Sequence, residues 1–556
     1  MAHTYDVIVI GGGISGLYAA HQLLYTKNEN DSNTFNKVLL VEKLSRLGGR
    51  IHTIYENGYQ YEAGAGRFSS KHKRLLGLLD RFGLHKIKNE HNLEYRHTTQ
   101  TQTQTITSTL APIKSTVTSE MITNVIQSAK TMEKQDLVNM TFKELCMKVV
   151  GAEKTEFIQS SFGYNAEFEI LNAADACEMF SSDFKGNLTY YSCTEGLSRL
   201  VDSLEKDLRS DKHKRCTINK ETRISSISWD KQQSVFNVQA IAATGKVVQY
   251  TARIVISAIP QKELLEWDIF TAEQRKLLHS VSPVSLHRIY GAWSANVMNW
   301  FTKNNIPKTT TDNHVRQFIP INRQTGLAML SYSDLKDADY WRKVADRGLK
   351  SLTDTLVRSL RSLFSPLTIP APDWIQSHYW PEGIHLWRKK SDSTVLTQRI
   401  QRILGHDVPF YITGEAFCKH QGWIEGGLEN VDIALSNISV SVHGGGATMP
   451  LTHLQYIKSH QGVLNKSNLK EFRTAYPDIE WVLYTDDDNI THMIDVTQWK
   501  WLHPGGSSVY DNYMYGDITK VFHTVPYHLQ ASTEPKLKNT VHSALKKYTI
   551  AKILDF

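Results

Sequence analysis

The chain has 556 residues, of which 41% are apolar and 21% are charged, and its formal net charge is +7 at pH 7. This length allows about three or four domains of roughly 150 residues each, and the composition is typical of a globular protein with a sizeable core. No uninterrupted apolar run reaches the roughly 20 residues that a membrane-spanning helix needs, so no membrane span is expected. The basic residues are scattered apart from a C-terminal cluster, so no nucleic-acid partner is expected.

The cysteines and the first residues bear on the compartment. Five cysteines are present, an odd number, and no two of them form a CxxC pair. This favours a reducing compartment and argues against disulfides or a cysteine-bound zinc ion. A strand pattern begins at Tyr5 and runs directly into a glycine-rich turn, which does not fit a secretion signal. We therefore expect a cytoplasmic protein.

The first predicted unit spans residues 5 to 43 and reads as a strand, a glycine turn, a helix, a polar insertion and a second strand. The turn holds Ser15 and three glycines at the GxGxxG spacing, which are Gly11, Gly13 and Gly16. This spacing allows a tight turn, a close approach of the backbone to a pyrophosphate, and close packing of the helix on the strand. Glu42 ends the second strand, where a carboxylate can accept hydrogen bonds from a ribose diol. The unit therefore predicts a dinucleotide-binding domain.

The middle of the chain alternates between polar, strand-like and helical segments. Residues 98 to 118 are dominated by Thr, Gln and Ser and read as either a polar strand pair or a mobile loop. Alternating segments between residues 218 and 260 predict a β-meander that returns to the cofactor domain. Helical patterns over about residues 261 to 282 and 335 to 364 suit a helical cap over the sheet.

A domain boundary is predicted after the last strand and helix of this region. The strand starts at Pro409, and the helix begins near Gly422 and fades before the glycine cluster at residues 443 to 447. Residues 466 to 545 then have their own strand, turn and helix pattern. This length is enough for one small, separate domain.

Two segments resemble the flavin-containing amine oxidase family. The first, from Glu42 to Arg67, reads EKLSRLGGRIHTIYENGYQYEAGAGR, and the second, over residues 412 to 427, reads ITGEAFCKHQGWIEGG. With gaps, the resemblance extends from about Tyr5 to Ser436. It implies that the chain binds FAD.

The resemblance also implies particular contacts with FAD. Arg50 would lie near the phosphates, Glu415 would bind the ribityl chain, and Ile224 would lie on the adenine side. The turn that passes the isoalloxazine ring would consist of Gly64, Ala65 and Gly66. Trp423 and Ile424 would open a helix whose positive end points at the flavin pyrimidine, where it stabilises negative charge.

Two positions depart from the family pattern. Members with covalent flavin carry a cysteine where PEGIHLW has Ile384, so non-covalent FAD is expected. Many members also have a lysine that holds a water against the reactive nitrogen of the flavin, and Arg288 aligns there. Arginine stays protonated and is a poorer proton shuttle, which puts the reaction with oxygen in question. The alternative for Arg288 is a buried or interface ion pair.

Three residues bear on the substrate. Trp423 and His385 align with the aromatic substrate cage of the family, and the alternative for both is ordinary packing. Arg67 aligns with an arginine of the L-amino-acid oxidases, whose guanidinium can grip a substrate carboxylate in two parallel hydrogen bonds. This favours an amino-acid substrate over a plain amine, although Arg67 could instead pair with protein carboxylates.

The region around an HPGG tetrapeptide at residues 503 to 506 resembles the cytochrome b5 family. The resemblance implies haem b, whose iron takes two imidazoles from separate loops of a small pocket. His503 is one expected ligand of the iron. The second is expected to be His528, with His523 as the alternative, because the family spacing falls just before His528. Ser507 and Ser508 replace the acidic residues usual after HPGG, so a haem-free relic of the fold is the alternative.

The predicted fold is a Rossmann-like α/β FAD-binding region of the two-dinucleotide-binding-domain type, with an α+β substrate domain and a small α+β cytochrome b5-like domain. The flavin region is expected over residues 1 to 438, followed by a linker (439 to 465), the b5-like domain (466 to 545) and a tail (546 to 556). Its FAD-binding segments are expected at about 1–75, 215–262 and 405–438, and its substrate and cap segments at about 76–214 and 263–404.

The predicted activity is FAD-dependent oxidation of a primary or secondary amine or an L-amino acid by hydride transfer, which gives an imine. Electrons would then pass to oxygen or to the fused haem. The alternatives are a desaturase- or isomerase-type oxidoreductase that acts on a non-amine substrate, and a non-catalytic flavoprotein scaffold.

Overall fold

The computed structural model describes residues 3–25, 35–89, 93–97, 113–183, 188–293, 299–405 and 407–442, and in the C-terminal part 463–464, 469, 472, 481–485, 491–495 and 549–553. The chain divides into two compact units, Met1–Ile438 and Ser439–Phe556. Within the described residues, no helix combines the length and the apolar character that crossing a membrane requires.

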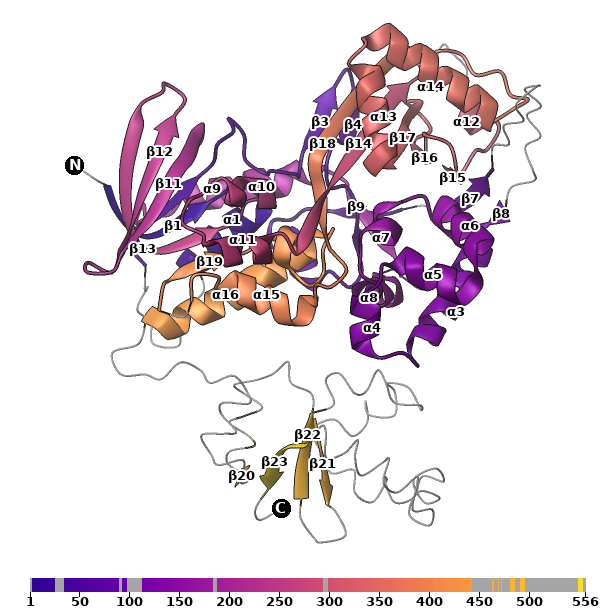
Figure 1. The fold of residues 1–556 in the computed structure, drawn as a ribbon. Coiled ribbons are helices and arrows are strands. Elements are labelled where there is room, and N and C mark those ends of the chain that lie inside the picture. Colours follow the sequence, from indigo (N-terminus) through magenta and orange to yellow (C-terminus); the bar gives the residue numbers. More distant parts are fainter. Residues whose placement is uncertain are drawn as a thin grey trace, which may run out of the picture. The chain divides into compact units, whose positions relative to one another are not determined.

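The first sheet of the larger unit has the strand order β10-β2-β1-β13-β12-β11, and β19 pairs with β13 (Figure 1). Its strands are β1 (His3–Ile10), β2 (Val38–Val41), β10 (Cys216–Asn219), β11 (Thr222–Asp230), β12 (Val235–Ala242), β13 (Val247–Ser257) and β19 (Phe410–Ile412). Strands β10, β2, β1, β13 and β19 run parallel, whereas β11, β12 and β13 form an antiparallel meander. The predicted βαβ unit and meander are therefore confirmed.

The parallel strands at the centre of this sheet have buried apolar runs because helices leave little of either face open to water. All four residues of β2 are buried, as are the last four of β1. The helices around this sheet are α1 (Ile14–Tyr25), α9 (Ser198–Arg209), α10 (Gln261–Leu265), α11 (Ala272–Leu278), α15 (Ser393–Gln401) and α16 (Ile424–Val442). Parallel strands carry their carboxyl ends to one edge of the sheet, where α1 begins.

The second sheet has the order β18-β14-β17-β16-β15-β7-β8. Its strands are β7 (Leu93–Arg96), β8 (Ile113–Lys114), β14 (Val281–Ala292), β15 (Lys308–Thr311), β16 (Gln317–Asn322), β17 (Leu327–Asp334) and β18 (Trp374–Trp387). Helices α12 (Trp300–Lys303), α13 (Leu335–Ala345) and α14 (Leu349–Leu363) lie beside it (Figure 1). The helical patterns predicted at 261 to 282 and 335 to 364 are confirmed as α10, α11, α13 and α14, although β14 already begins at Val281.

A helical group lies next to β7 and β8, within the predicted substrate and helical cap segment at about 76–214, although its individual helices were not predicted (Figure 1). It consists of α3 (Ser115–Ala129), α4 (Lys134–Val138), α5 (Phe142–Val150), α6 (Ala152–Phe162), α7 (Ala166–Glu169) and α8 (Ala173–Asp183). Phe142, Phe168 and Phe180 pack together in its core and are almost completely buried. Most of the Thr-rich segment at 98 to 118 lies outside the described residues, and its last residues begin α3.

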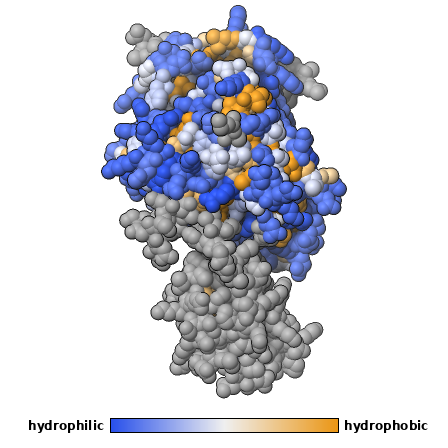
Figure 2. All heavy atoms as spheres, turned by 90° about the vertical axis from the view of Figure 1, so that its left-hand side faces the viewer, coloured by the Kyte–Doolittle hydropathy of each residue, from blue (hydrophilic) through white to orange (hydrophobic). Residues whose placement is uncertain are grey.

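The remaining elements of the larger unit are short. They are α2 (Lys73–Arg81), β3 (Thr53–Glu56), β4 (Tyr59–Glu62), β5 (Phe68–Ser69), β6 (Lys86–Lys88), β9 (Tyr190–Cys193) and the 3-10 turn η1 (Glu415–Phe417). The face of the larger unit in Figure 2 is mostly hydrophilic, and its apolar side chains form small, separate patches. The five cysteines are free thiols.

The smaller unit holds a four-stranded sheet in the order β20-β23-β22-β21. Its strands are β20 (Val463–Leu464), β21 (Trp481–Thr485), β22 (Thr491–Asp495) and β23 (Thr549–Ile553). The expected linker therefore contains β20, and the expected tail contains β23, which pairs with β22 and β20. The predicted haem ligands His503 and His528, and the alternative His523, lie outside the described residues.

Candidate cofactor and substrate site

A cavity of about 660 Å³ opens in the larger unit. Segments from distant parts of the chain line it: the turn into α1, the end of β2, residues 46–51, the turn after β13, β18, and the stretch from β19 to α16. Most of the predicted site residues line this cavity, and they are Gly11, Gly13, Ser15, Glu42, Arg50, Gly64, Ala65, Ile224, Arg288, Glu415, Trp423 and Ile424. Four predicted residues are not among those that line it: Gly16, Gly66, Arg67 and His385.

The three glycines of the turn are required for different physical reasons. Gly11 has a φ of +103°, a conformation that L side chains rarely adopt. A Cβ atom on Gly16 would lie 1.9 Å from the carbonyl oxygen of Gly11, so only glycine allows the helix to pack this closely. A Cβ atom on Gly13 would meet nothing within 4 Å, because this residue faces the cavity. Gly13 therefore leaves room for a ligand, whereas Gly16 serves packing.

Glu42 joins the end of β2 to the glycine turn. Its Oε2 accepts a hydrogen bond from the N–H of Gly12 at 2.7 Å, and its Oε1 accepts one from the N–H of Leu44 at 2.8 Å. A carboxylate has about four acceptor positions, so two remain for a ligand diol. Ile224, on β11, lines the same cavity and is 5% exposed, which gives an apolar contact for a planar ring.

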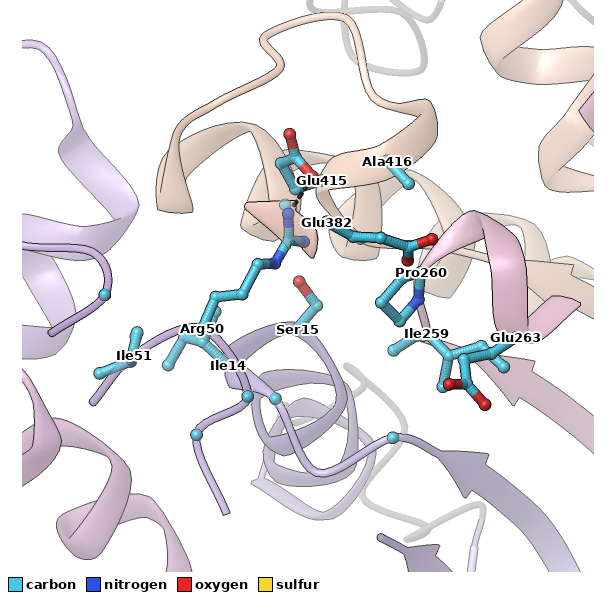
Figure 3. Close-up of a pocket in the computed structure, with 18 of the residues that line it drawn as sticks. Ile14, Ser15, Arg50, Ile51, Ile259, Pro260, Glu263, Glu382, Glu415 and Ala416 are labelled. Carbon is cyan, nitrogen blue, oxygen red and sulfur yellow. Dashed lines mark hydrogen bonds and ion pairs between the residues drawn. The ribbon is translucent and has the colours of Figure 1, made fainter. Parts of the chain in front are cut away.

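Arg50 and Glu415 form an ion pair beside the start of α1 (Figure 3). Arg50 Nη1 donates to Glu415 Oε2 at 2.6 Å and to the carbonyl oxygen of Gly383 at 3.1 Å. Glu415 also accepts hydrogen bonds from the N–H groups of His385 and Gly422, at 2.9 and 3.0 Å. Burial raises the pKa of Glu415, but Arg50 and His385 outweigh burial and hold its pKa well below the ordinary value. Glu415 therefore carries a fixed negative charge.

The structure does not bring His385 into the cavity beside Trp423, as the family alignment implied. Its imidazole is completely buried, and Nδ1 lies 3.0 Å from Glu415 Oε2. Alternate residues of a strand point to opposite faces, and on β18 it is Ile384 that lines the cavity. His385 therefore lies behind Glu415 and orients it. No cysteine is among the described residues that line the cavity.

Arg288 contacts backbone carbonyl groups, not a carboxylate. Its Nη1 donates to the carbonyl oxygens of Glu62, at 3.0 Å, and of Gly64. Its guanidinium carbon lies 4.4 Å from the centre of the Tyr332 ring. Among the described residues no acidic side chain forms an ion pair with Arg288, so its charge faces the glycine turn at Gly64–Gly66 and the cavity. Gly66 lies behind this turn, where a Cβ atom would be 2.9 Å from Cβ of Glu62.

Trp423 separates the cavity from a second group of aromatic and basic side chains. Its Nε1 donates to Asp183 Oδ2 at 2.9 Å, which fixes the indole ring. Arg67 lies over the rings of Tyr190 and Trp423, at 5.4 and 5.7 Å from their centres. Its Nη2 is 3.4 Å from the hydroxyl of Tyr164, and in the described part of the chain no carboxylate forms an ion pair with it. Arg67 is thus a cation next to the cavity that forms no ion pair with a carboxylate among the described residues, and the buried carboxyl of Glu167 is its acidic neighbour.

Helix α16 points its N-terminus at the cavity. It begins at Ile424, directly after Trp423, so its first N–H groups are close to the lining residues. The side chain of Glu425 turns away and caps another helix, because its oxygens accept from the N–H groups of Arg74 and Leu75, both at 3.0 Å. The N-termini of α1 and α16 therefore both contribute partial positive charge to this cavity.

Several lining residues were missed by the sequence analysis, namely Lys262, Tyr332, Trp380 and Glu382. Trp380 Nε1 donates to the carbonyl oxygen of Ala63 at 2.8 Å and so supports the turn at Gly64. Trp380 and Glu382 lie four and two residues before Ile384, and their closeness in the chain to this predicted position was the one available signal for them. Lys262 and Tyr332 lie in segments with no recognisable motif.

The donors and shapes of this cavity fit a flavin dinucleotide. A glycine turn at a helix N-terminus suits a diphosphate, the carboxylate of Glu42 suits a ribose diol, and Ile224 suits an adenine ring. Trp380, Trp423 and Tyr332 offer the planar surfaces that a flavin ring needs. The fold and the site thus define a dinucleotide-dependent oxidoreductase class.

Comparison with known proteins gives the family. Residues 14–430 match the family described as flavin containing amine oxidoreductase, and the chain belongs to this family. The (S)-6-hydroxynicotine oxidase of Paenarthrobacter nicotinovorans is 38% identical over 97 residues, which are 17% of this chain and 21% of that protein. The uncharacterized protein R188 of Acanthamoeba polyphaga mimivirus is 21% identical over 513 residues, which are 79% of this chain and 94% of that protein. These matches show the family and leave the substrate open.

Solved structures show the same fold. A triple mutant of putrescine oxidase, redesigned in its cofactor binding, has a TM-score of 0.61 and 16% sequence identity. The match covers 79% of this chain and 100% of the putrescine oxidase. The larger unit therefore has the FAD-binding fold of the amine oxidases, and FAD is the cofactor that its cavity fits.

Proposed function

We propose that this protein is an FAD-dependent oxidase that takes a hydride from the carbon next to the nitrogen of an amine or an L-amino acid. The observation that carries the proposal is the cavity itself, which joins the glycine turn, Arg50 and Glu415 to the aromatic segment at Trp423. The product is an imine, which water hydrolyses to a carbonyl compound and ammonia or a smaller amine. FAD supplies the hydride acceptor when it is bound.

The residues of the chain bind FAD, orient the substrate and exclude water from the site. The N-terminus of α1 and the open space at Gly13 receive the diphosphate, and Glu42 receives the ribose. The N-terminus of α16 favours negative charge at the far end of the cavity. Trp423 is fixed by Asp183 and covers this end, which keeps the reacting carbon out of water. Arg288 stays protonated and holds the turn at Gly64.

An amino-acid substrate is favoured over a plain amine by Arg67. Arg67 lies beside Trp423 and forms no ion pair with a carboxylate among the described residues, and the nearby Glu167 has a pKa raised to about 8 by burial, so Arg67 can bind the carboxylate of a substrate. The competing substrate class is a diamine or polyamine, which the name of the putrescine oxidase structure suggests. Steady-state assays with L-amino acids and with amines, reading ammonia and hydrogen peroxide, separate the two.

The proposal fails if FAD is bound but no amine or amino acid yields ammonia, an aldehyde or peroxide. That result would favour the desaturase- or isomerase-type alternative. Protein that cannot be loaded with FAD would favour the non-catalytic scaffold.

We further propose that the smaller unit contains a cytochrome b5-like domain, expected over residues 466 to 545, that accepts electrons from the flavin unit. Support comes from the HPGG tetrapeptide at His503, with His528 as the second iron ligand and His523 as the alternative. Absorbance of the purified protein tests this directly, since a haem b Soret band must be present and must be lost in His503→Ala. A protein without a Soret band after growth with added haem would leave oxygen as the acceptor.

A further inference from the structure

Glu382 is a second carboxylate in the cavity, and it differs from Glu415 in its surroundings. It lies in β18, lines the cavity, and its side chain is 11% exposed. Its Oε1 is buried and has no hydrogen-bond partner among the described residues. The nearest cationic groups are beyond hydrogen-bond distance, since Lys262 Nζ lies 3.8 Å from Oε1 and His385 Nε2 lies 3.9 Å from Oε2. A buried carboxylate oxygen without a donor is costly, so a ligand that brings a donor would relieve it.

Glu415, by contrast, has no acceptor capacity to spare. Its two oxygens receive hydrogen bonds from Arg50 Nη1, the N–H and the ring of His385, and the N–H of Gly422. Four hydrogen bonds fill the lone pairs of one carboxylate. Glu415 therefore holds the protein together at this point, and a cofactor hydroxyl would find a free acceptor at Glu382 instead.

The position of Glu382 indicates which part of the cofactor it faces. Figure 3 shows its side chain extending toward Pro260, with Ser15 of the α1 turn below it. The start of α1 is the place for the diphosphate, which has no hydrogen to donate and would be repelled by a carboxylate. The donors on either side of the diphosphate are sugar hydroxyls. Glu42 takes the ribose side, which leaves the ribityl hydroxyls for Glu382.

We propose that Glu382 is a cofactor-binding residue whose carboxylate accepts hydrogen bonds from the ribityl hydroxyl groups of FAD. The proposal rests on the proposed function only in requiring that FAD occupies the cavity. Lys262 sits close enough to reduce the repulsion between Glu382 and the diphosphate, since both residues line the cavity. Glu382 thereby takes the role that the family resemblance assigned to Glu415.

Binding of FAD to the full-length apoprotein tests this without any measurement of turnover. We expect Glu382→Ala to raise the dissociation constant of FAD about 10- to 100-fold, and Glu382→Gln, which keeps one acceptor oxygen, to recover part of the loss. The matched control is Glu205→Ala, because Glu205 is not among the lining residues of the cavity and is paired with Arg209. This control should bind FAD within about twofold of the wild type.

FAD analogues that lack one ribityl hydroxyl identify the contact. The analogue without the bonded hydroxyl should bind equally well to the wild type and to Glu382→Ala. Loss of folding is detected separately by the melting temperature of the apoprotein. Glu382→Ala removes a buried carboxylate oxygen that has no hydrogen-bond donor among the described residues, so its apoprotein should melt no lower than the wild-type apoprotein. Equal FAD affinity in Glu382→Ala and the wild type, or the same loss with every analogue, would overturn the proposal. A wild-type protein that does not bind FAD would overturn it together with the proposed function, whereas tight FAD binding without amine turnover would affect the proposed function alone.

Discussion

Arg50 and Glu415 lie 365 positions apart in the chain, yet Nη1 of one is 2.6 Å from Oε2 of the other. Arg50 follows the first strand–helix–strand unit, and Glu415 follows the last strand of the same sheet. Their ion pair therefore joins the two ends of the flavin region beside the glycine turn. The two side chains are 29% and 11% exposed, so water screens the pair only in part.

Removal of Arg50 should destabilise the apoprotein, because Glu415 would keep its charge and lose its strongest donor. We expect Arg50→Ala to lower the free energy of unfolding by about 2–3 kcal/mol and to weaken FAD binding. Denaturant unfolding of the apoprotein measures the first effect. In a double-mutant cycle with Glu415→Gln the two losses should not add, and additive losses would show that the ion pair is unimportant.

Alanine substitutions at two glycines of the same turn should differ in which property they change, the stability of the apoprotein or the binding of FAD. Gly16→Ala forces Cβ against the carbonyl oxygen of Gly11 at 1.9 Å, so the apoprotein should lose about 1–3 kcal/mol of stability or fail to fold. Gly13→Ala meets open space, so apoprotein stability should stay within about 1 kcal/mol while FAD binding falls. Thermal unfolding with and without FAD checks both. Normal FAD affinity in Gly13→Ala would mean that the cofactor does not approach this residue.

Arg67 should distinguish the two substrate classes. Loss of a two-pronged guanidinium–carboxylate contact should lower kcat/KM for an L-amino acid by about 100-fold or more in Arg67→Ala, with little change for an amine that has no carboxylate. Arg67→Lys should recover little, because an ammonium lacks the planar fork. The control is Arg81→Ala, an exposed residue paired with Asp207. An unchanged rate on the amino acid in Arg67→Ala would remove the support for this substrate class.

Glu167 should make the stability of the protein depend on pH. Burial raises its pKa to about 8, with a smaller contribution from Asp334, so the folded state holds a proton that the unfolded state has already released above about pH 4.5. The folded state binds more protons in this window, and stability therefore falls as the pH rises from about 4.5 to 8. Glu167→Gln removes this cost and should flatten the decline. Melting curves of both proteins between pH 5 and 8.5 test this, and parallel declines would contradict the assignment.

Much of the cofactor site could be predicted from the sequence because its residues belong to short motifs. Gly11, Gly13 and Glu42 were predicted from their spacing in one strand–helix–strand unit, and Arg50 from the family resemblance of the segment that follows. All four line the cavity. The orientation of His385 could not be predicted, since it depends on the phase of β18, and a shift by one residue reverses the face. That Oε1 of Glu382 has no hydrogen-bond donor among the described residues could not be predicted either, because it depends on the distances to Lys262 and His385 in the folded chain.

The individual helices α3 to α8 could not be predicted from the sequence for a related reason. Its helices are short, from 4 to 15 residues, and their apolar faces are defined by one another more than by a strong local period. The haem ligands proposed at His503 and His528 lie outside the described residues, so the motif itself remains their support.

Amine or amino-acid oxidation by the bound flavin is best tested by anaerobic titration of the FAD-loaded protein with a panel of amines and L-amino acids. We expect at least one substrate to bleach the flavin absorbance near 450 nm in proportion to the amount added, and ammonia or a smaller amine to appear in equal amount after hydrolysis. Flavin that is reduced by dithionite but stays oxidised with every amine and amino acid would contradict it.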